Sequence, residues 1–260
     1  MDPHEQEARV SRQMLNEKTF QNVPHLEPIT IPGRPDVAPK VMTLNGTIWR
    51  ASFLLVLAIA SAAYGWSFGD QISGTVGTIM MVGLLGLVVL SIVTAFKPQI
   101  APFTGPLYSV VMGFWAGVIS FGYEQEFDGI VLQAVFATFA VFAGALFLYG
   151  SRIVKVTKKF VAVVMMATLG ILLMYVAAIV LGLFGVELGF INDPTPLGIA
   201  VSVGICIVAA LNLFVDFYFI EEGAKAGAPT YMSWYSAFGL IATLIWLYLE
   251  ILRLLGKVRS

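Results

Sequence analysis

The chain has few of the residues that most often carry metal or covalent chemistry. Its 260 residues include a single cysteine, Cys206, and two histidines, His4 and His25, which both precede the first long apolar run. One cysteine excludes an internal disulfide framework and a cysteine-based metal cluster. Without histidine in the apolar part, a Ser-His pair, a His-Glu-x-x-His zinc site and an imidazole base are excluded there. We therefore expect no enzymatic activity and no cofactor.

The chain also has few charged residues. Only 12% of the residues are Asp, Glu, Lys or Arg, whereas 58% are apolar. Soluble domains carry roughly 25% charged residues, so the composition predicts an integral membrane protein with no nucleic-acid partner. The last apolar run also lacks the lysine that a light-driven rhodopsin needs to bind retinal, because Lys257 lies beyond it.

Seven apolar runs make up most of the chain. They cover residues 47–66, 75–96, 106–123, 129–150, 160–184, 197–220 and 231–255. Each is long enough to cross a hydrocarbon core of about 30 Å as a helix, and none alternates over about 10 residues as a barrel strand would. The connections contain helix breakers, namely Lys97-Pro98, Gly105-Pro106 and Asn192-Asp193-Pro194. The sequence therefore predicts an all-α seven-helix transmembrane bundle.

The amino-terminal segment differs from the rest. Residues 1–40 are polar, contain six prolines and have no sustained apolar face. This composition is typical of a flexible segment, so we expect a tail over residues 1–42 and a membrane domain over residues 43–256. No secretory signal peptide is recognisable, and the first span is expected to act as its own insertion signal.

The loop charges predict the orientation. The first, third and fifth loops contain acidic residues and no Lys or Arg, whereas the loops between them contain Lys97, four cations within residues 151–159, and Lys225. Because cations are retained on the cytoplasmic side, we expect a cytoplasmic amino terminus. One group opposes this rule at the other terminus, which seven full crossings place outside: Arg253, Lys257 and Arg259. Either the last run crosses against the rule or it does not cross completely.

Two acidic residues, Asp216 and Glu250, lie inside apolar runs, where ionisable groups are costly and are the first functional candidates. Asp216 lies five residues, or roughly 7–8 Å, before Glu221-Glu222, which we take as the cytoplasmic boundary. Asn212 is four residues earlier and shares its helical face. Burial and the adjacent acidic pair are expected to make the protonation of Asp216 respond to pH. The alternative is an interfacial aspartate that caps a loop or pairs with a lysine.

Glu250 has a simpler interpretation. It lies about 28 Å along the last run, too far from the cytoplasmic end to meet Asp216. Arg253 follows three residues later, so we expect an ion pair within one helix turn. Small residues at helix-packing spacing, as in Gly113-x-x-x-Gly117, are expected to allow close approach of two helices and to have no catalytic role.

The order of several short features resembles the transmembrane Bax inhibitor motif family, in a bacterial form, over roughly residues 43–256. These features are Gly105-Pro106-Leu107-Tyr108 with Gly113 and Gly117, Gly129-Ile130-Val131-x-Gln133-Ala134-x-x-x-Thr138, Asp216, and Leu252-Arg253-Leu254-Leu255-Gly256. The resemblance implies a bundle whose last helix is wrapped by the other six. It also implies a pH-sensitive calcium leak governed by one aspartate on the sixth span and one on the seventh, in the bacterial inner membrane.

Asp216 matches the first aspartate of that family, and the position of the second falls on Thr243. Two coupled carboxylates titrate as a pair, which a lone aspartate cannot do, although Thr243 is able to hydrogen-bond to Asp216. The neighbouring small or acidic position falls on Gly239. Lys97 approximates the family's basic latch, with Arg50 as a second candidate, and Asn212 is a further possible partner. Asp216 is also the candidate for a transient calcium contact.

Three functions are compatible with these observations. The first is a cation leak, with calcium as the favoured ion, gated by Asp216. The second is a regulator that binds another membrane protein, such as a quality-control protease, through the tail. The third is a proton-coupled transporter, which the single convincing acid and the absence of paired broken helices disfavour. All three have the lipid bilayer as a partner.

Overall fold

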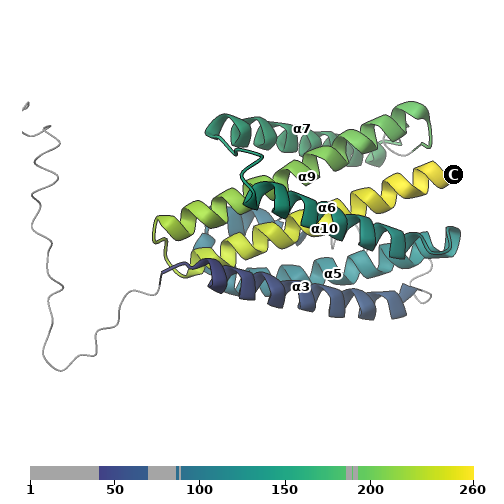
Figure 1. The fold of residues 1–260 in the computed structure, drawn as a ribbon. Coiled ribbons are helices and arrows are strands. Elements are labelled where there is room, and N and C mark those ends of the chain that lie inside the picture. Colours follow the sequence, from purple (N-terminus) through teal and green to yellow (C-terminus); the bar gives the residue numbers. More distant parts are fainter. Residues whose placement is uncertain (1–40, 70–85, 88, 186–188, 190–192) are drawn as a thin grey trace, which may run out of the picture. The chain divides into compact units, whose positions relative to one another are not determined.

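The computed structural model describes residues 41–69, 86–87, 89–185, 189 and 193–260 (Figure 1). Residues Val41–Ser260 form one compact unit. Its named elements are all helical: α3 (Leu44–Ser67), η2 (Pro98–Ile100), α5 (Ala101–Glu126), α6 (Ile130–Gly150), α7 (Lys158–Leu183), α9 (Pro196–Lys225) and α10 (Tyr231–Arg259). In the described part, a lone bridge between Val41 and Pro229 is the only β pairing.

Six helices are long and apolar enough to cross a membrane. They are α3, α5 with η2, α6, α7, α9 and α10, with spanning segments of 21 to 30 residues. The all-helical class and the multi-pass character follow directly from these elements. The predicted run 75–96 falls largely outside the described residues, and so does the tail 1–40. Of that run, residues 86–87 and 89–96 are described, and they are helical.

Threonine begins three of these helices. Thr43, Thr157 and Thr195 each accept a hydrogen bond from the backbone N–H three residues later, over 3.0 to 3.2 Å. This N-cap satisfies one of the free N–H groups in the first turn of each helix. The local sequence therefore fixes the starts of α3, α7 and α9.

The expected break at Gly105-Pro106 is wrong. α5 begins at Ala101 and continues through Pro106 to Glu126. Pro106 lies in the second turn, where its missing N–H removes a single backbone hydrogen bond, and neighbouring membrane helices tolerate such a loss. The break at Lys97-Pro98 is confirmed, because Lys97 is non-helical and a 3₁₀ turn follows it.

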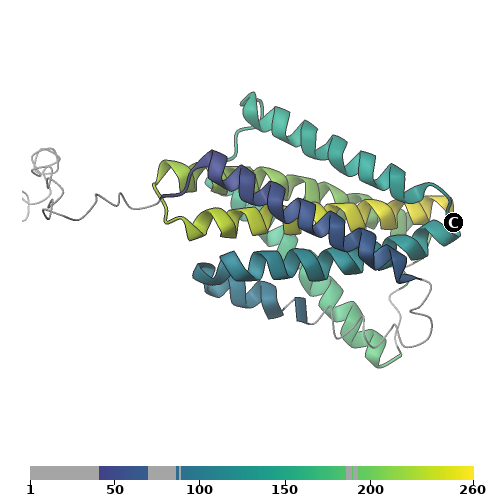
Figure 2. The ribbon, with the colours of Figure 1, turned by 90° about the horizontal axis from the view of Figure 1, so that it is seen from below.

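The glycine spacing in α5 acts as expected. A Cβ at Gly113 would clash with the backbone of Ala58, and one at Gly117 with the backbone of Ala62. The Ser61 hydroxyl also donates to the carbonyl of Val110 over 2.6 Å. α3 and α5 therefore lie side by side with their backbones in close approach (Figure 2).

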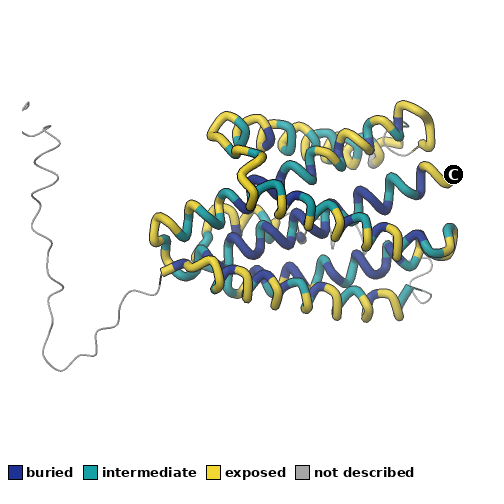
Figure 3. Tube along the Cα trace, viewed as in Figure 1, coloured by how far each residue is buried: buried dark blue, intermediate teal, exposed yellow. Residues whose placement is uncertain are grey.

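The last helix, α10, packs against α3, α5, α6 and α9, and many residues in its middle are buried (Figure 3). Near its start, the N–H of Met42 donates to the carbonyl of Ala228 over 2.7 Å. At its end, Arg259 donates to the carbonyl of Asp128 and to Gln133, in the turn between α5 and α6 and the start of α6. A helix of 29 residues is about 44 Å long, so α10 extends from one end of the bundle to the other.

Candidate functional site

Asp216 of α9 faces α10. Its Oδ1 atom lies 3.4 Å from where a Cβ of Gly239 would stand, and the side chain of Thr243 is a hydrogen-bonding neighbour of its carboxyl. The Oδ2 atom is fully buried and has no hydrogen-bond partner among the described residues. A polar atom in this state is costly, because it has exchanged water for an apolar surrounding without compensation. The structure thus brings together Asp216, Gly239 and Thr243, the positions that the family resemblance aligned.

Asn212 does not join this group. Its Nδ2 atom donates to the hydroxyl of Thr168 on α7 over 2.7 Å and to the carbonyl of Val208 over 2.9 Å. Although Asn212 and Asp216 are one turn apart on α9, their side chains have different partners, so the expected shared polar face is divided between α7 and α10. Asn212 therefore connects α9 to α7. Its side chain makes no hydrogen bond to Asp216, so its hydrogen bonds give no support to a role in the gate.

The two predicted latch cations also lie apart from Asp216. Lys97 is exposed in the turn before η2. Arg50 of α3 donates to the carbonyl of Gly46 over 2.7 Å and lies over the ring of Trp234 at 5.4 Å, and its Nε atom is buried without a partner in the described structure. No cationic side chain among the described residues forms an ion pair with Asp216. In this structure, neither Lys97 nor Arg50 forms the expected latch contact with Asp216.

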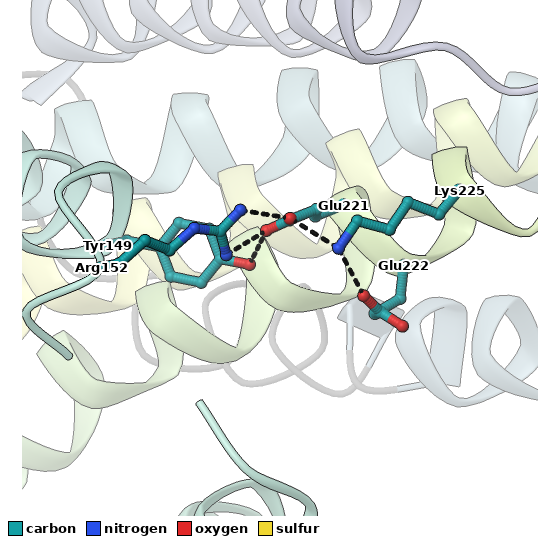
Figure 4. A network of polar contacts seen from close by, with 5 residues as sticks. All are labelled: Tyr149, Arg152, Glu221, Glu222 and Lys225. Atoms are coloured by element: carbon teal, nitrogen blue, oxygen red, sulfur yellow. Dashed lines mark hydrogen bonds and ion pairs between the residues drawn. The ribbon is translucent and has the colours of Figure 1, made fainter. Parts of the chain in front are cut away.

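The acidic pair that follows Asp216 is largely compensated. Glu221 accepts hydrogen bonds from Tyr149 and Arg152 and forms an ion pair with Lys225 at 2.7 Å (Figure 4). Glu222 pairs with the same lysine at 3.0 Å. Because two cations adjoin Glu221, its charge acts on Asp216 less than the sequence alone predicts. α9 also continues through this pair to Lys225, one turn beyond the expected boundary.

Glu250 forms a second buried polar cluster. Only 3% of its surface is exposed, and the expected ion pair with Arg253 is present at 3.5 Å. The cluster is larger than that pair: the Tyr175 hydroxyl of α7 donates to Glu250 over 2.6 Å, and the indole N–H of Trp246 donates over 3.1 Å. Arg253 in turn donates to the oxygen of Tyr175. The helical spacing of Trp246 and Glu250 was visible in the sequence, whereas the role of Tyr175 was not.

The cations that oppose the charge rule all contact protein groups, and one of them, Lys257, is buried. Lys257 is 7% exposed and donates to the carbonyl of Gly198 over 3.1 Å and to Ser202 over 2.9 Å. Arg259 contacts the turn between α5 and α6 and the start of α6, and Arg253 lies against Tyr175. Hydrogen-bond acceptors of the protein therefore contact the basic end of α10. These contacts give a physical reason why this end lies far from the start of α3 despite its positive charge.

Metal ligands do not cluster in the described part of the chain, where no three His, Cys, Asp or Glu side chains group together. Around Asp216 the protein supplies a carboxylate and one hydroxyl. Calcium takes six to eight oxygen ligands, so this set suits a passing cation that retains water and not a resident one.

The whole chain matches a known family. A model described as Bax inhibitor 1 like matches residues 2–260, which includes the tail as well as the range over which the motifs resembled the family. A comparison with curated proteins finds no match. With six apolar helices that are long enough to cross a membrane, the chain is a multi-pass membrane protein, and it belongs to the Bax inhibitor 1 like family.

Proposed function

We propose that this protein is a non-enzymatic, pH-sensitive leak for cations, with calcium as the favoured ion and Asp216 as the gate. The observation that carries the proposal is the buried, unpartnered Oδ2 atom of Asp216 at the contact between α9 and α10. Structural carboxylates in an apolar interior are paired, as Glu250 is. An acid left without a counter-charge in such a place is a candidate for function.

The gate works through the charge of one carboxyl group. An ionised Asp216 has no ion-pair partner among the described residues, so its charge has to be met by water, by a passing cation or by movement of α9 against α10. A neutral Asp216 keeps its contact with Thr243 and leaves α9 and α10 packed. We therefore expect the leak to rise as pH increases and Asp216 loses its proton.

Lys97 and Arg50 are the proposed latch cations. Arg50 lies over Trp234, which is five residues and about 7 Å along α10 from Gly239. Its buried Nε atom lacks a partner in the described structure, so a partner would be favourable. A lysine at position 97 offers one charge without the bidentate fork of arginine, which makes it the weaker latch.

A seventh span completes the proposed architecture. α3 and α5 run in the same direction, because Leu54 lies beside Gly105 and Ala62 beside Gly117. The end of α3 and the start of α5 therefore lie at opposite ends of the bundle, which supports the predicted crossing at residues 75–96. We further propose that α10 is the central helix, that the amino terminus is cytoplasmic and that the protein lies in a bacterial inner membrane.

Calcium-loaded liposomes test the leak. Wild type is expected to release more calcium in mildly alkaline than in mildly acidic buffer, whereas Asp216→Asn, which cannot ionise, is expected to leak little at either pH. Asp128→Asn makes the same change at an exposed acid in the turn between α5 and α6, and serves as the matched control. Equal leaks from wild type and Asp216→Asn at both pH values would overturn the proposal.

A second candidate is a regulator that binds another membrane protein through the tail. It is favoured by the family match, which extends into residues 2–40. This function predicts that deletion of residues 1–40 abolishes the cellular phenotype while Asp216→Asn is silent. The leak predicts the reverse, so the two variants separate the hypotheses.

A further inference from the structure

A cavity that is partly open to solvent lies where α6 passes into α7 and α9 ends. Its polar lining consists of three cations and two carboxylates together with two tyrosines: Arg152, Lys155, Lys225, Glu221, Glu222, Tyr149 and Tyr218. Tyrosine is enriched at the depth of the lipid headgroups, and these two lie near the ends of spanning helices. The cavity is therefore placed at the surface of the membrane and not within it.

Glu221 fixes two of the cations on the wall of this cavity. Its carboxylate accepts one hydrogen bond from each terminal nitrogen of Arg152, Nη1 and Nη2, over 3.0 and 2.5 Å, and pairs with the ammonium of Lys225 at 2.7 Å (Figure 4). The Tyr149 hydroxyl donates to the same carboxylate. Both cations remain well exposed, with 64% of the Arg152 side chain and 59% of the Lys225 side chain accessible. The Glu221 carboxylate also holds the pKa of Arg152 above its ordinary value.

The backbone at Arg152 is unusual. It is the one non-glycine residue with positive φ, 60°, among those that the structure describes. This conformation is unfavourable for residues other than glycine and persists where surrounding contacts hold it. The bidentate contact with Glu221 is such a contact, and it keeps the guanidinium at the cavity.

The segment after Arg152 has an excess of positive charge. Lys155, Lys158 and Lys159 form no ion pair with any residue that the structure describes, and the segment 151–159 contains no acid. Ile153, between these cations, is 65% exposed. A soluble anion would gain nothing from an exposed isoleucine, whereas a phospholipid presents a phosphate and acyl chains together.

We propose that this cavity binds the phosphate of an anionic phospholipid headgroup, with Lys155 and Arg152 as the principal cations and Ile153 against the glycerol and acyl region. Among the residues that the structure describes, Lys155 is the cation of the wall that forms no ion pair, so its charge is available to a phosphate. The site is independent of the proposed gate and does not require the leak.

Thermal unfolding of the full chain in neutral detergent micelles tests the site. A lipid that binds the folded state raises the midpoint temperature. We expect phosphatidylglycerol to raise it more than phosphatidylcholine with the same acyl chains, and native mass spectrometry to retain bound phosphatidylglycerol. Inorganic phosphate is expected to give no rise.

Two matched variants sharpen the result. Lys155→Gln is expected to remove more than half of the phosphatidylglycerol-specific rise, while Lys97→Gln, at an exposed lysine away from the cavity, keeps it. Asp216→Asn is also expected to keep the rise, which separates this site from the gate. Equal effects of the two lipids, a full rise in Lys155→Gln, or the same rise with inorganic phosphate would each overturn the proposal.

Discussion

The two acidic residues inside the apolar runs have opposite surroundings. Glu250 receives hydrogen bonds from Tyr175 and Trp246 and pairs with Arg253. Asp216 has one hydroxyl neighbour and an oxygen without a partner in the described structure. A fully satisfied buried carboxylate joins helices, whereas an unsatisfied one is free to respond to a proton or a cation.

Removal of the Tyr175 hydroxyl tests the structural role of Glu250. In Tyr175→Phe, Glu250 and Arg253 each lose a hydrogen bond in a buried place, which is expected to lower the free energy of unfolding by about 1–3 kcal/mol. Chemical unfolding in detergent measures this change. Tyr64→Phe alters an exposed tyrosine and is expected to have little effect. Equal stability of the two variants would show that the cluster does not hold α7 to α10.

Thr243→Val tests the contact between α9 and α10. Valine has nearly the shape of threonine but has no hydroxyl, so Asp216 loses its hydrogen-bonding neighbour. A hydroxyl that donates to a carboxylate favours its charged form, and its removal is expected to move the half-maximal calcium leak to higher pH. Liposome flux across a pH series measures the shift. An unchanged pH profile would exclude Thr243 as a partner of the gate.

At the scale of elements, the helices differ in how firmly they are packed. α3 and α5 meet through glycine, alanine and serine with close backbones. α7 is the least buried of the six spanning helices, because only 6% of its 18-residue apolar segment is buried inside the protein. Thr168 and Tyr175 connect it to other helices through hydrogen bonds. The rest of the described chain therefore leaves most of α7 uncovered.

Gly117→Ala tests the close contact of α3 and α5. A methyl group at this position would clash with the Ala62 backbone, and such overpacking is expected to cost about 1–3 kcal/mol of unfolding free energy. Gly144→Ala places the same methyl group on α6, where no atom lies within 4 Å of it. That control is expected to be neutral or to stabilise by up to about 1 kcal/mol through helix propensity. Thermal unfolding of both variants in one detergent distinguishes them, and equal stability would contradict the tight contact.

At the scale of the whole molecule, α10 joins the two ends of the bundle. It starts beside residues 41–42 and ends beside the turn between α5 and α6. Its basic end contacts protein acceptors, so the cations that oppose the charge rule are accommodated by the fold.

Cysteine labelling in cells tests this crossing. In a Cys206→Ala background, Ser260→Cys is expected to react with a membrane-impermeant maleimide added outside. Ser151→Cys, exposed in the turn between α6 and α7, is expected to react only after the cells are opened. Protection of position 260 together with labelling of position 151 would reverse the orientation, and the same accessibility at both would contradict a full crossing.

The sequence by itself determined the membrane class and most helix positions, because apolar runs and threonine caps are local features, and it singled out Asp216 and Glu250 as the acids inside the apolar runs. The family resemblance aligned Thr243 and Gly239 with Asp216, and the structure brings these three residues together. Only the tertiary structure decided which side chains meet. Asn212 donates a hydrogen bond to α7, Tyr175 donates one to Glu250, and Lys257 donates one to Ser202 near the start of α9. The physical reason is that helical periodicity fixes the face of a residue, whereas its partner depends on which helix packs against that face.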